Sequence, residues 1–481
     1  MPWKPPTPIE VYNLLPKTNC GKCGEPNCMA FAVKLVNFEA LIDQCAPLIE
    51  DKNYVDNYSK LRQLLSPPVR EIVVKGPKSA VKIGGEYVLY RHELRYMNPT
   101  AIAVDVDDSM DKDIILQRIE KIQKFEYEYV GRKLKLDLIA IRSTSNDVKQ
   151  FAKTVQLVSE NSNLPLILCS ANPRIIEAGL NVLTTEYRPL IYAATKDNWR
   201  EMADLAKRFE APLAVASPGD LDTLVSLVKT ISEGLGINDL VLDPGTFTGF
   251  QGLAYTVKAF TWLRYKAVHD LWRYAGYPLI GTPISVWTSL EGDIMDKMWW
   301  EAIMATLLMT RYADVLIMHS LEGWVLLPQV LWRFQLYTDP RKPVAVPAGV
   351  REIGKPSEIS PVIVTSNYAL TYSIVLSDVE KAKVNAWLVV IDTEGLAVDV
   401  AVAAKKFTGD KIAEVIKSAE LDKKVKHKVL IIPGKAARVS GDIEDSTGWK
   451  VIVGPMDSSE IGKFIEKMWT EDKLKEFLLQ R

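Results

Sequence analysis

Four cysteines near the amino end have the residue type and the spacing of a metal centre. Cys20, Cys23 and Cys28 lie close together, and Cys45 follows after a gap of sixteen residues. The chain has only one other cysteine, Cys169. Thiolates are the usual ligands of zinc and of iron–sulfur clusters, so this local group indicates one shared metal site.

Three kinds of cysteine site are considered for this group. Disulfides are typical of small secreted domains, whereas this chain is long and begins with a proline-rich segment that is no secretory leader. Structural zinc usually takes two close pairs of ligands, so zinc remains an alternative. Three close cysteines and one distant cysteine favour a 4Fe-4S cluster. With four protein ligands, such a cluster would relay electrons and leave no iron open to a substrate.

Composition bounds the class of protein. The 481 residues are 48% hydrophobic and 25% charged, which predicts a folded protein of several domains. The formal net charge of −1 gives no attraction to nucleic acid. No apolar stretch has membrane-spanning length, because Glu301 interrupts the strongest candidate. We therefore expect a cytoplasmic protein without a nucleic-acid or membrane partner.

Residues 96–325 repeat one pattern of a short apolar run, a polar or glycine-rich loop and a helical stretch. Eight such β/α units predict a TIM (β/α)8 barrel, with a doubly wound sheet as the rival. Before it we expect a 4Fe-4S cluster domain over residues 1–60 and a linker with short β pieces, at 70–75, 80–83 and 86–90, over residues 61–95. The eight strands are expected to begin near Ala101, Leu136, Leu164, Leu190, Pro212, Leu240, Pro278 and Val315.

The loops after the predicted barrel strands would form its functional face. Asp105 and Asp243 are acid/base candidates there, but carboxylates at strand ends more often cap helices or pair with neighbouring loops, and we favour that role. Cys169 is expected to be a small buried hydrophobe, and Trp299, Trp300, Met304, Leu307 and Leu308 are expected in the core or a subunit interface. The other polar residues of the face are Asp107, Arg142, Ser170, Asn172, Thr246, Thr282 and His319.

The last third of the chain predicts an open α/β domain over residues 326–457. Short strands are expected at 361–365, 386–392, 428–432 and 450–453, and ligands bind such sheets at the carboxyl ends of the strands. Neither a GxGxxG fingerprint nor a phosphate loop is present, so the ligand is no ordinary nucleotide by motif. A C-terminal helix over residues 458–481 would share an apolar face. That face contains Ile461, Phe464, Ile465, Met468 and Trp469, with Leu474, Phe477 and Leu478 beyond.

Four motifs together carry a family resemblance: CGKCGEPNC with its distant cysteine, LVLDPGT, VTSNYALTY and VVIDTEGLAV. Over essentially its full length the chain resembles the large (gamma) subunit of the corrinoid iron–sulfur protein, a component of the acetyl-CoA decarbonylase/synthase system. The resemblance implies a cobamide in the C-terminal domain. Its cobalt, as Co(I), would accept a methyl group from a methyltetrahydropterin, either tetrahydrosarcinapterin, tetrahydromethanopterin or tetrahydrofolate. It would then pass the methyl group to the nickel–iron–sulfur centre of acetyl-CoA synthase, or work in reverse when acetyl-CoA is cleaved.

The resemblance also implies site residues. The corrin would lie against the loop of Tyr368, Ala369, Leu370 and Thr371, with Thr371 beneath the cobalt. An Asp-x-His-x-x-Gly motif is absent, and His427 is expected to be solvated between its lysine neighbours, so cobalt would lack a strong lower ligand and be easier to reduce. The cluster of Cys20, Cys23, Cys28 and Cys45 would restore Co(I) after oxidation. Further corrinoid contacts would come from Thr338, Val344, Pro433 and Gly434.

Partners and activity are implied in the same way. The chain would be a methyltransferase subunit of anaerobic archaea, acting in methanogenesis or the Wood–Ljungdahl pathway. It would form a heterodimer with the small (delta) subunit, and would meet acetyl-CoA synthase/CO dehydrogenase subunits and a methyltetrahydropterin or its methyltransferase. Two alternatives stay open. One is an iron–sulfur electron-transfer or scaffold subunit without corrinoid, and the other is a self-sufficient methyltransferase whose barrel binds the pterin.

Overall fold

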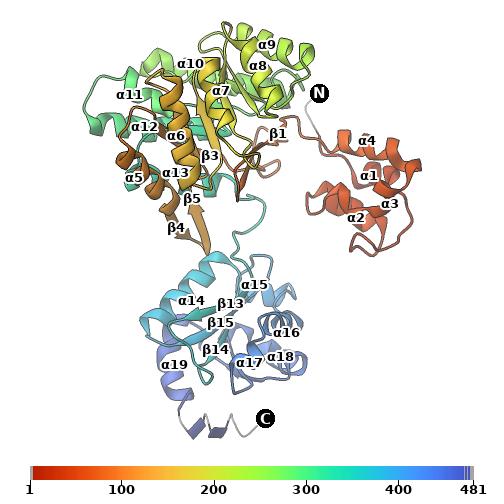
Figure 1. Cartoon of the computed structure of the whole chain (residues 1–481). Coiled ribbons are helices and arrows are strands. Elements are labelled where there is room, and N and C mark those ends of the chain that lie inside the picture. Colours follow the sequence, from red (N-terminus) through yellow and green to blue (C-terminus); the bar gives the residue numbers. More distant parts are fainter. Residues whose placement is uncertain (1–3, 471, 474, 477–481) are drawn as a thin grey trace. The chain divides into compact units, whose positions relative to one another are not determined.

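The computed structural model describes residues 4–470, 472–473 and 475–476. The chain divides into two compact units (Figure 1). The first comprises Met1–Glu126 and Lys135–Tyr337, and the second Tyr127–Leu134 and Thr338–Arg481. Among the described residues, no helix has both the length and the apolar character needed to cross a bilayer.

The cysteine-rich amino end folds into short helices. They are α1 (Pro8–Leu14), α2 (Cys28–Val36), α3 (Ala46–Glu50) and α4 (Val55–Leu64). Thr7 and Glu10 form a capping box on α1, and the Asn27 side chain caps α2. A small core holds these helices together through Val11, Phe31, Leu35, Leu48 and Leu61.

An antiparallel hairpin follows, with β1 (Glu71–Lys75) paired to β2 (Ala80–Gly84). Its Ile72, Val74 and Ile83 join the hydrophobic cluster of the barrel interior, so this segment is part of the barrel body. The third β piece expected in this stretch, at 86–90, is wrong. The Glu86 carboxylate there accepts hydrogen bonds from the Met97 amide at 3.0 and 3.2 Å, and these contacts hold the segment as a loop.

Eight parallel strands form one sheet in the order β10-β9-β8-β7-β6-β3-β12-β11. A parallel bridge between Leu242 and Leu279 links its two ends, so the sheet is a nearly closed barrel. All eight predicted strands are present, and this closure excludes the doubly wound alternative. The strands are β3 (Ala101–Asp107), β6 (Leu138–Arg142), β7 (Leu166–Cys169), β8 (Leu190–Ala194), β9 (Leu213–Ala216), β10 (Leu240–Asp243), β11 (Ile280–Gly281) and β12 (Val315–Met318).

Helices alternate with these strands along the chain. Several begin at an Asp or Asn whose side chain accepts from a first-turn amide, as Asp147, Asn172, Asp220 and Asp293 do. These caps fix where each loop after a strand ends. The helices are α5 (Lys112–Lys124), α6 (Val148–Asn161), α7 (Pro173–Asn181), α8 (Trp199–Arg208), α9 (Leu221–Lys229), α10 (Gly249–Val268), α11 (Val286–Ser289), α12 (Ile294–Thr310) and α13 (Gly323–Leu336).

The second unit contains a five-stranded sheet in the order β13-β15-β14-β16-β17. The four predicted strands are β14 (Val362–Ser366), β15 (Ala386–Ile391), β16 (Val429–Ile432) and β17 (Lys450–Val453), and all pair in parallel. An antiparallel edge strand that was not predicted, β13 (Gly349–Ile353), pairs with β15. The chain places β15 on one side of β14 and β16 on the other, which makes a topological switch point where α/β sheets bind ligands.

Helices follow the parallel strands of this sheet. They are α14 (Ala369–Lys381), α15 (Val398–Ala403), α16 (Gly409–Ser418), α17 (Leu421–Lys424), α18 (Ser440–Thr447) and α19 (Ile461–Met468). In the predicted C-terminal helix, Ile461, Phe464, Ile465 and Trp469 pack on the core of the second unit. The part of that prediction that includes Leu474, Phe477 and Leu478 lies outside the described residues.

The second unit also includes a hairpin from the middle of the barrel sequence. Between α5 and β6 the chain forms β4 (Glu126–Tyr129) and β5 (Arg132–Lys135), which make a two-stranded sheet. Residues 127–134 of this hairpin belong to the second unit. This hairpin could not be predicted from apolar patterning, because its strands are mostly exposed and polar and show no buried face.

Candidate functional site

The four predicted metal ligands line one small cavity of about 10 Å³. Cys28 is the first residue of α2, and its amide donates to the Asn19 side chain at 2.9 Å. Cys28 and Cys45 are buried, Cys23 is half-buried and Cys20 is exposed. The four cysteines therefore line one cavity, and its Cys20 side is open to solvent.

The thiols of this cavity lie in different electrostatic surroundings. Hydrogen bonds from the Lys22 backbone and the Thr18 hydroxyl lower the pKa of Cys20. Burial raises the pKa of Cys45, and the charges of the neighbouring cysteines add to that rise. A bound metal centre removes this penalty because its positive charge replaces the proton. In the described part of the chain, no three His, Cys, Asp or Glu side chains are grouped to hold a single metal ion.

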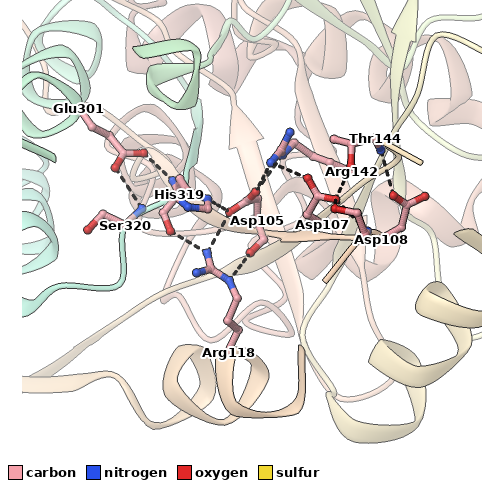
Figure 2. A network of polar contacts seen from close by, with 10 residues as sticks. Asp105, Asp107, Asp108, Arg118, Arg142, Thr144, Glu301, His319 and Ser320 are labelled. Atoms are coloured by element: carbon pink, nitrogen blue, oxygen red, sulfur yellow. Dashed lines mark hydrogen bonds and ion pairs between the residues drawn. The ribbon is translucent and has the colours of Figure 1, made fainter. Parts of the chain in front are cut away.

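At the carboxyl end of the barrel, Asp105 is the hub of a polar network (Figure 2). Its Oδ1 accepts from Arg118 Nη2 at 2.9 Å and contacts His319 Nδ1 at 2.7 Å, while Oδ2 accepts from Arg142 Nε at 2.8 Å. Arg142 ends β6, and His319 follows β12. The network thus joins three predicted residues with Arg118, which the sequence analysis missed because it lies on helix α5.

Other carboxylates of this network hold loops together. Burial opposes ionisation of Asp107, but hydrogen bonds from Thr144 and Ser109 with the Arg142 charge lower its pKa. Figure 2 also shows Glu301 of α12, which is fully buried and accepts from the amides of His319 at 2.5 Å and Ser320 at 3.0 Å. Burial raises the pKa of Glu301. Both carboxylates therefore already accept hydrogen bonds from other residues of the chain.

Asp243 forms a second polar group on the barrel face. Tyr192 donates to its Oδ2 at 2.5 Å, and the Gly245 amide donates to its Oδ1 at 2.8 Å. Burial raises the pKa values of both Asp243 and Tyr192. Nearby, Thr246 Oγ1 accepts from the Thr282 amide at 3.0 Å. Ser170 and Asn172 instead lie in the turn before α7, where Ser170 Oγ accepts from the Asn172 amide and Asn172 caps the helix.

The prediction for Cys169 agrees with the structure, whereas the prediction for His427 does not. Cys169 is a buried strand residue, as predicted, and burial raises the pKa of its thiol to about 12. The prediction that His427 is solvated is wrong, because it is 1% exposed. Its Nε2 contacts the Ser360 carbonyl at 2.9 Å, its ring packs edge-on against Trp469, and burial lowers its pKa. Alternation at the start of β16 turns the imidazole inward while the flanking lysines point outward.

The two tryptophans of α12 do not lie in a hydrophobic core. Trp299 is 59% exposed and Trp300 is 39% exposed, whereas Met304 and Leu308 are buried. Leu307 is half-buried. A core position is therefore wrong for the two tryptophans, and a subunit interface there stays a prediction.

A cavity of about 330 Å³ lies at the switch point of the C-terminal sheet. Its floor includes Thr365 at the end of β14 and Ile432 at the end of β16. Helices α14 and α15 and the loop after β17 contribute the walls. Of the eight residues expected to touch a corrinoid, Thr371 and Pro433 line this cavity.

The cavity combines an unpaired polar atom with an apolar rim. Thr365 lines the cavity, and its Oγ1 is buried and has no hydrogen-bond partner in the described protein. An unpaired buried hydroxyl costs about 1–3 kcal/mol, so this atom favours a ligand that can hydrogen-bond to it. Large apolar side chains on the surrounding elements are unusually exposed: Leu370 57%, Ile374 47%, Val400 52% and Met456 68%.

The other expected corrinoid contacts form the loop beside this cavity. The Ala369 amide donates to the Val344 carbonyl at 2.9 Å, and Ala345 forms an antiparallel bridge with Tyr368. Val344, Tyr368 and Ala369 are therefore neighbours. Gly434 lies in close packing next to Pro433, where an added Cβ would meet the Gly454 carbonyl and Met456 amide at 2.9 Å.

Thr338 lies outside the cavity lining, whereas Asn367 holds the loop beside the cavity. Thr338 begins the second segment of this unit and does not line the cavity. Asn367, which the sequence analysis missed, fixes the loop instead. Its Oδ1 accepts from Thr393 Oγ1 at 2.9 Å and from the amides of Thr393 and Gly395 at 3.0 Å. Its position directly after a buried strand is the signal that could have found it.

Comparisons with known proteins cover nearly the whole chain. The family model described as "CO dehydrogenase/acetyl-CoA synthase delta subunit" matches residues 71–465, and that described as "Putative Fe-S cluster" matches residues 15–47. The acetyl-CoA decarbonylase/synthase complex subunit gamma 2 of Methanosarcina thermophila is 44% identical, over 96% of this chain and 98% of its own length. The corresponding gamma subunit of Methanothermobacter thermautotrophicus is also 44% identical, over 97% of this chain and 99% of its own.

Solved structures resemble the chain only distantly. A Yersinia pestis dihydropteroate synthase with a pterine-sulfa conjugate aligns with 55% of this chain and 98% of its own, at 13% identity and a TM-score of 0.38. A likeness this weak carries no functional argument. The family model is described as a delta subunit, whereas the relatives are named gamma subunits, and both comparisons cover more than half of the chain. The chain belongs to the family of the CO dehydrogenase/acetyl-CoA synthase delta subunit, with archaeal gamma subunits among its relatives.

Proposed function

We propose that this chain is a subunit of an acetyl-CoA decarbonylase/synthase complex and carries a methyl group on a cobamide held by its C-terminal unit. The names of relatives that align over nearly the whole chain support the first part. The observation that carries the second part is the cavity at the switch point, where the buried unpaired hydroxyl of Thr365 lies beside exposed apolar side chains.

The chemistry of this site suits a corrinoid. A corrin is a broad ring with apolar faces and amide side chains around its edge. Leu370, Ile374 and Met456 offer apolar contact to such a face, and Thr365 Oγ1 offers a hydrogen bond to an amide group. A cavity of about 330 Å³ is smaller than a whole cobamide, so it would receive only part of the cofactor.

The residues around the cavity leave the metal without a strong protein ligand. Thr371, in the first turn of α14, lines the cavity and would lie beneath the cobalt. The cavity lining contains no histidine, and the Nε2 of His427 is held by the Ser360 carbonyl at the amino end of β16. The weak ligation of cobalt is part of this proposal, and it is supported by the absence of histidine from the cavity lining and by the burial of His427.

Cys20, Cys23, Cys28 and Cys45 would hold a 4Fe-4S cluster, with the exposed Cys20 on the side open to an electron donor. When bound, the cobamide would supply a nucleophile for methyl transfer between a methyltetrahydropterin and a nickel–iron–sulfur centre, and the cluster would supply the electron that keeps this nucleophile reduced. Partners would be the small (delta) subunit and the acetyl-CoA synthase/CO dehydrogenase subunits.

Anaerobic purification of the full chain with its companion subunit tests this proposal. We expect corrinoid absorption, one cobalt and about four irons per chain. A sample that contains iron but shows no corrinoid absorption after incubation with cobamide would contradict the methyl-carrier role. That result would favour the alternative of an iron–sulfur scaffold subunit.

A further inference from the structure

The tip of the β4–β5 hairpin has an unusual residue for its backbone conformation. Its two central residues, Val130 and Gly131, both have positive φ angles, of +52° and +67°. A two-residue hairpin turn with this geometry strongly prefers Asn-Gly, because a β-branched residue is disfavoured in the left-handed region. Val130 is therefore poorly suited to the turn that contains it.

Strained residues persist where the surrounding structure requires them. Val130 packs against the core cluster of the second unit that contains Val346, Ala369 and Tyr372. Gly131 lies beside the same segment, since a Cβ built on it would be 3.6 Å from Val346 Cγ1. The apolar contact of the Val130 side chain thus explains why a valine lies at the tip, although the backbone conformation there disfavours it.

The segment under the hairpin tip is tied directly to the loop beside the cavity. The Val346 amide donates to the Asn367 carbonyl at 2.9 Å, and the Ala369 amide donates to the Val344 carbonyl at 2.9 Å. Asn367 in turn fixes the loop after β15 through its Oδ1. Contacts therefore run from Val130 through residues 344–346 to residues 367–371, which end at the cavity wall.

We propose that Val130 is a positioning residue for the cofactor loop, residues 367–371, and that the hairpin serves the second unit as a support for this loop. The inference rests on the proposed function, because that function assigns the loop to the corrinoid. Val130 acts through the core cluster that contains Val346, and it touches neither cofactor nor substrate.

Val130→Asn tests the inference, since it relaxes the turn and removes the apolar contact. Lys383→Asn is the matched control, because Lys383 is an exposed residue with φ +54° in the same unit and its side chain supports no loop. Val130→Ile keeps the contact and should behave as the wild type. Val346→Ala removes the contact from the other side and leaves the turn intact.

The first measurement is amide hydrogen exchange in the full chain without cobamide. We expect the Val346 and Ala369 amides to exchange about tenfold faster in Val130→Asn and Val346→Ala, with no change in Lys383→Asn or Val130→Ile. Unchanged exchange at both amides in Val130→Asn and in Val346→Ala would overturn the inference. The Val346→Ala variant keeps the test valid even if the hairpin substitution impairs folding.

The second measurement is a spectroscopic titration of each full-length variant with cob(II)alamin. We expect Val130→Asn to bind about tenfold more weakly than wild type while its unfolding midpoint stays equal or rises, because turn strain is removed. Equal binding by wild type and Val130→Asn would overturn the positioning role. If the wild type binds no cobamide but the exchange result holds, the proposed function fails and the support of the loop by Val130 stands.

Discussion

His319 Nδ1 lies 2.7 Å from Asp105 Oδ1 across the seam where the first and last strands of the barrel meet. Since an ionised carboxylate only accepts hydrogen bonds, Nδ1 carries the proton in this pair. Arg118 and Arg142 donate to the same carboxylate, so a single buried charge holds three cationic or protonated groups from α5, β6 and the loop after β12. The network thereby joins elements from both ends of the barrel sequence.

Asp105→Asn should destabilise the barrel strongly. Removing one partner of a buried charge network leaves Arg118 without its ion-pair partner and Arg142 with Asp107 alone, and such a loss typically costs roughly 3–5 kcal/mol. Denaturant unfolding of the full chain measures the loss. Glu120→Gln is the control, because it breaks an exposed pair with Lys124 on α5 and should leave stability unchanged. Similar behaviour of the two variants would show that the Asp105 network contributes little.

Glu86 should make stability depend on pH. Burial raises the pKa of its carboxyl to about 8, well above the value of an unfolded chain. The folded protein therefore binds more protons than the unfolded chain between about pH 4.5 and 8, and the free energy of unfolding falls as the pH rises through this window. Above the folded pKa the dependence ends.

Glu86→Gln isolates this effect, since the amide is the same size and does not ionise. Its free energy of unfolding relative to wild type should rise by roughly 3–5 kcal/mol between pH 5 and pH 9. Urea denaturation of both proteins at each pH gives the difference between their free energies of unfolding. The contributions of the other titrating groups cancel in this difference. A difference independent of pH would mean that Glu86 is ionised in the folded protein at both values.

Much of the fold follows from apolar runs that are buried on both faces. The eight barrel strands and β14, β15 and β16 of the second unit are such runs, and the sequence predicts each of them. The edge strand β17 is also predicted, although it is only partly buried. The hairpin β4–β5 is mostly polar and could not be predicted in this way. Its role in the second unit depends on Val130, one partly buried residue at its tip.

The sites were predictable to different degrees for a physical reason. The four cysteines could be identified as metal ligands from their residue type and spacing alone. The corrinoid contacts depend on backbone geometry, and only Thr371 and Pro433 of the eight expected residues line the cavity. Arg118 and Asn367 act from a helix and a loop on partners distant in sequence, and no spacing rule identifies them.

Cys20→Ala should separate the two cofactor roles. Loss of one cluster ligand should lower the iron content and prevent reduction of cob(II)alamin by a low-potential donor, while corrinoid binding by the second unit is retained. Cys169→Ala is the matched control, because Cys169 is buried in the barrel away from the cluster cavity. Iron analysis and Co(I) absorbance measure both effects. Normal reactivation in Cys20→Ala would contradict the relay role.

Thr365→Val should have opposite effects on stability and on ligand binding. The Thr365 hydroxyl is buried without a partner, so replacing it with a methyl group of the same shape should stabilise the cofactor-free chain by about 1–2 kcal/mol. The same change removes a hydrogen-bonding atom from the cavity, so cob(II)alamin should bind more weakly.

Thr393→Val provides the comparison, because Thr393 is equally buried but its hydroxyl contacts Asn367 Oδ1 and the Leu396 carbonyl. That variant should be less stable without the cofactor, since it loses bonds that the folded chain already makes. Thermal unfolding and cobamide titration of both variants give the comparison. If Thr365→Val loses as much stability as Thr393→Val, its hydroxyl has a partner within the protein and is not available to a ligand. If Thr365→Val is more stable than the wild type but binds cobamide more weakly, the Thr365 hydroxyl lacks a hydrogen bond in the cofactor-free chain and obtains one only from a ligand.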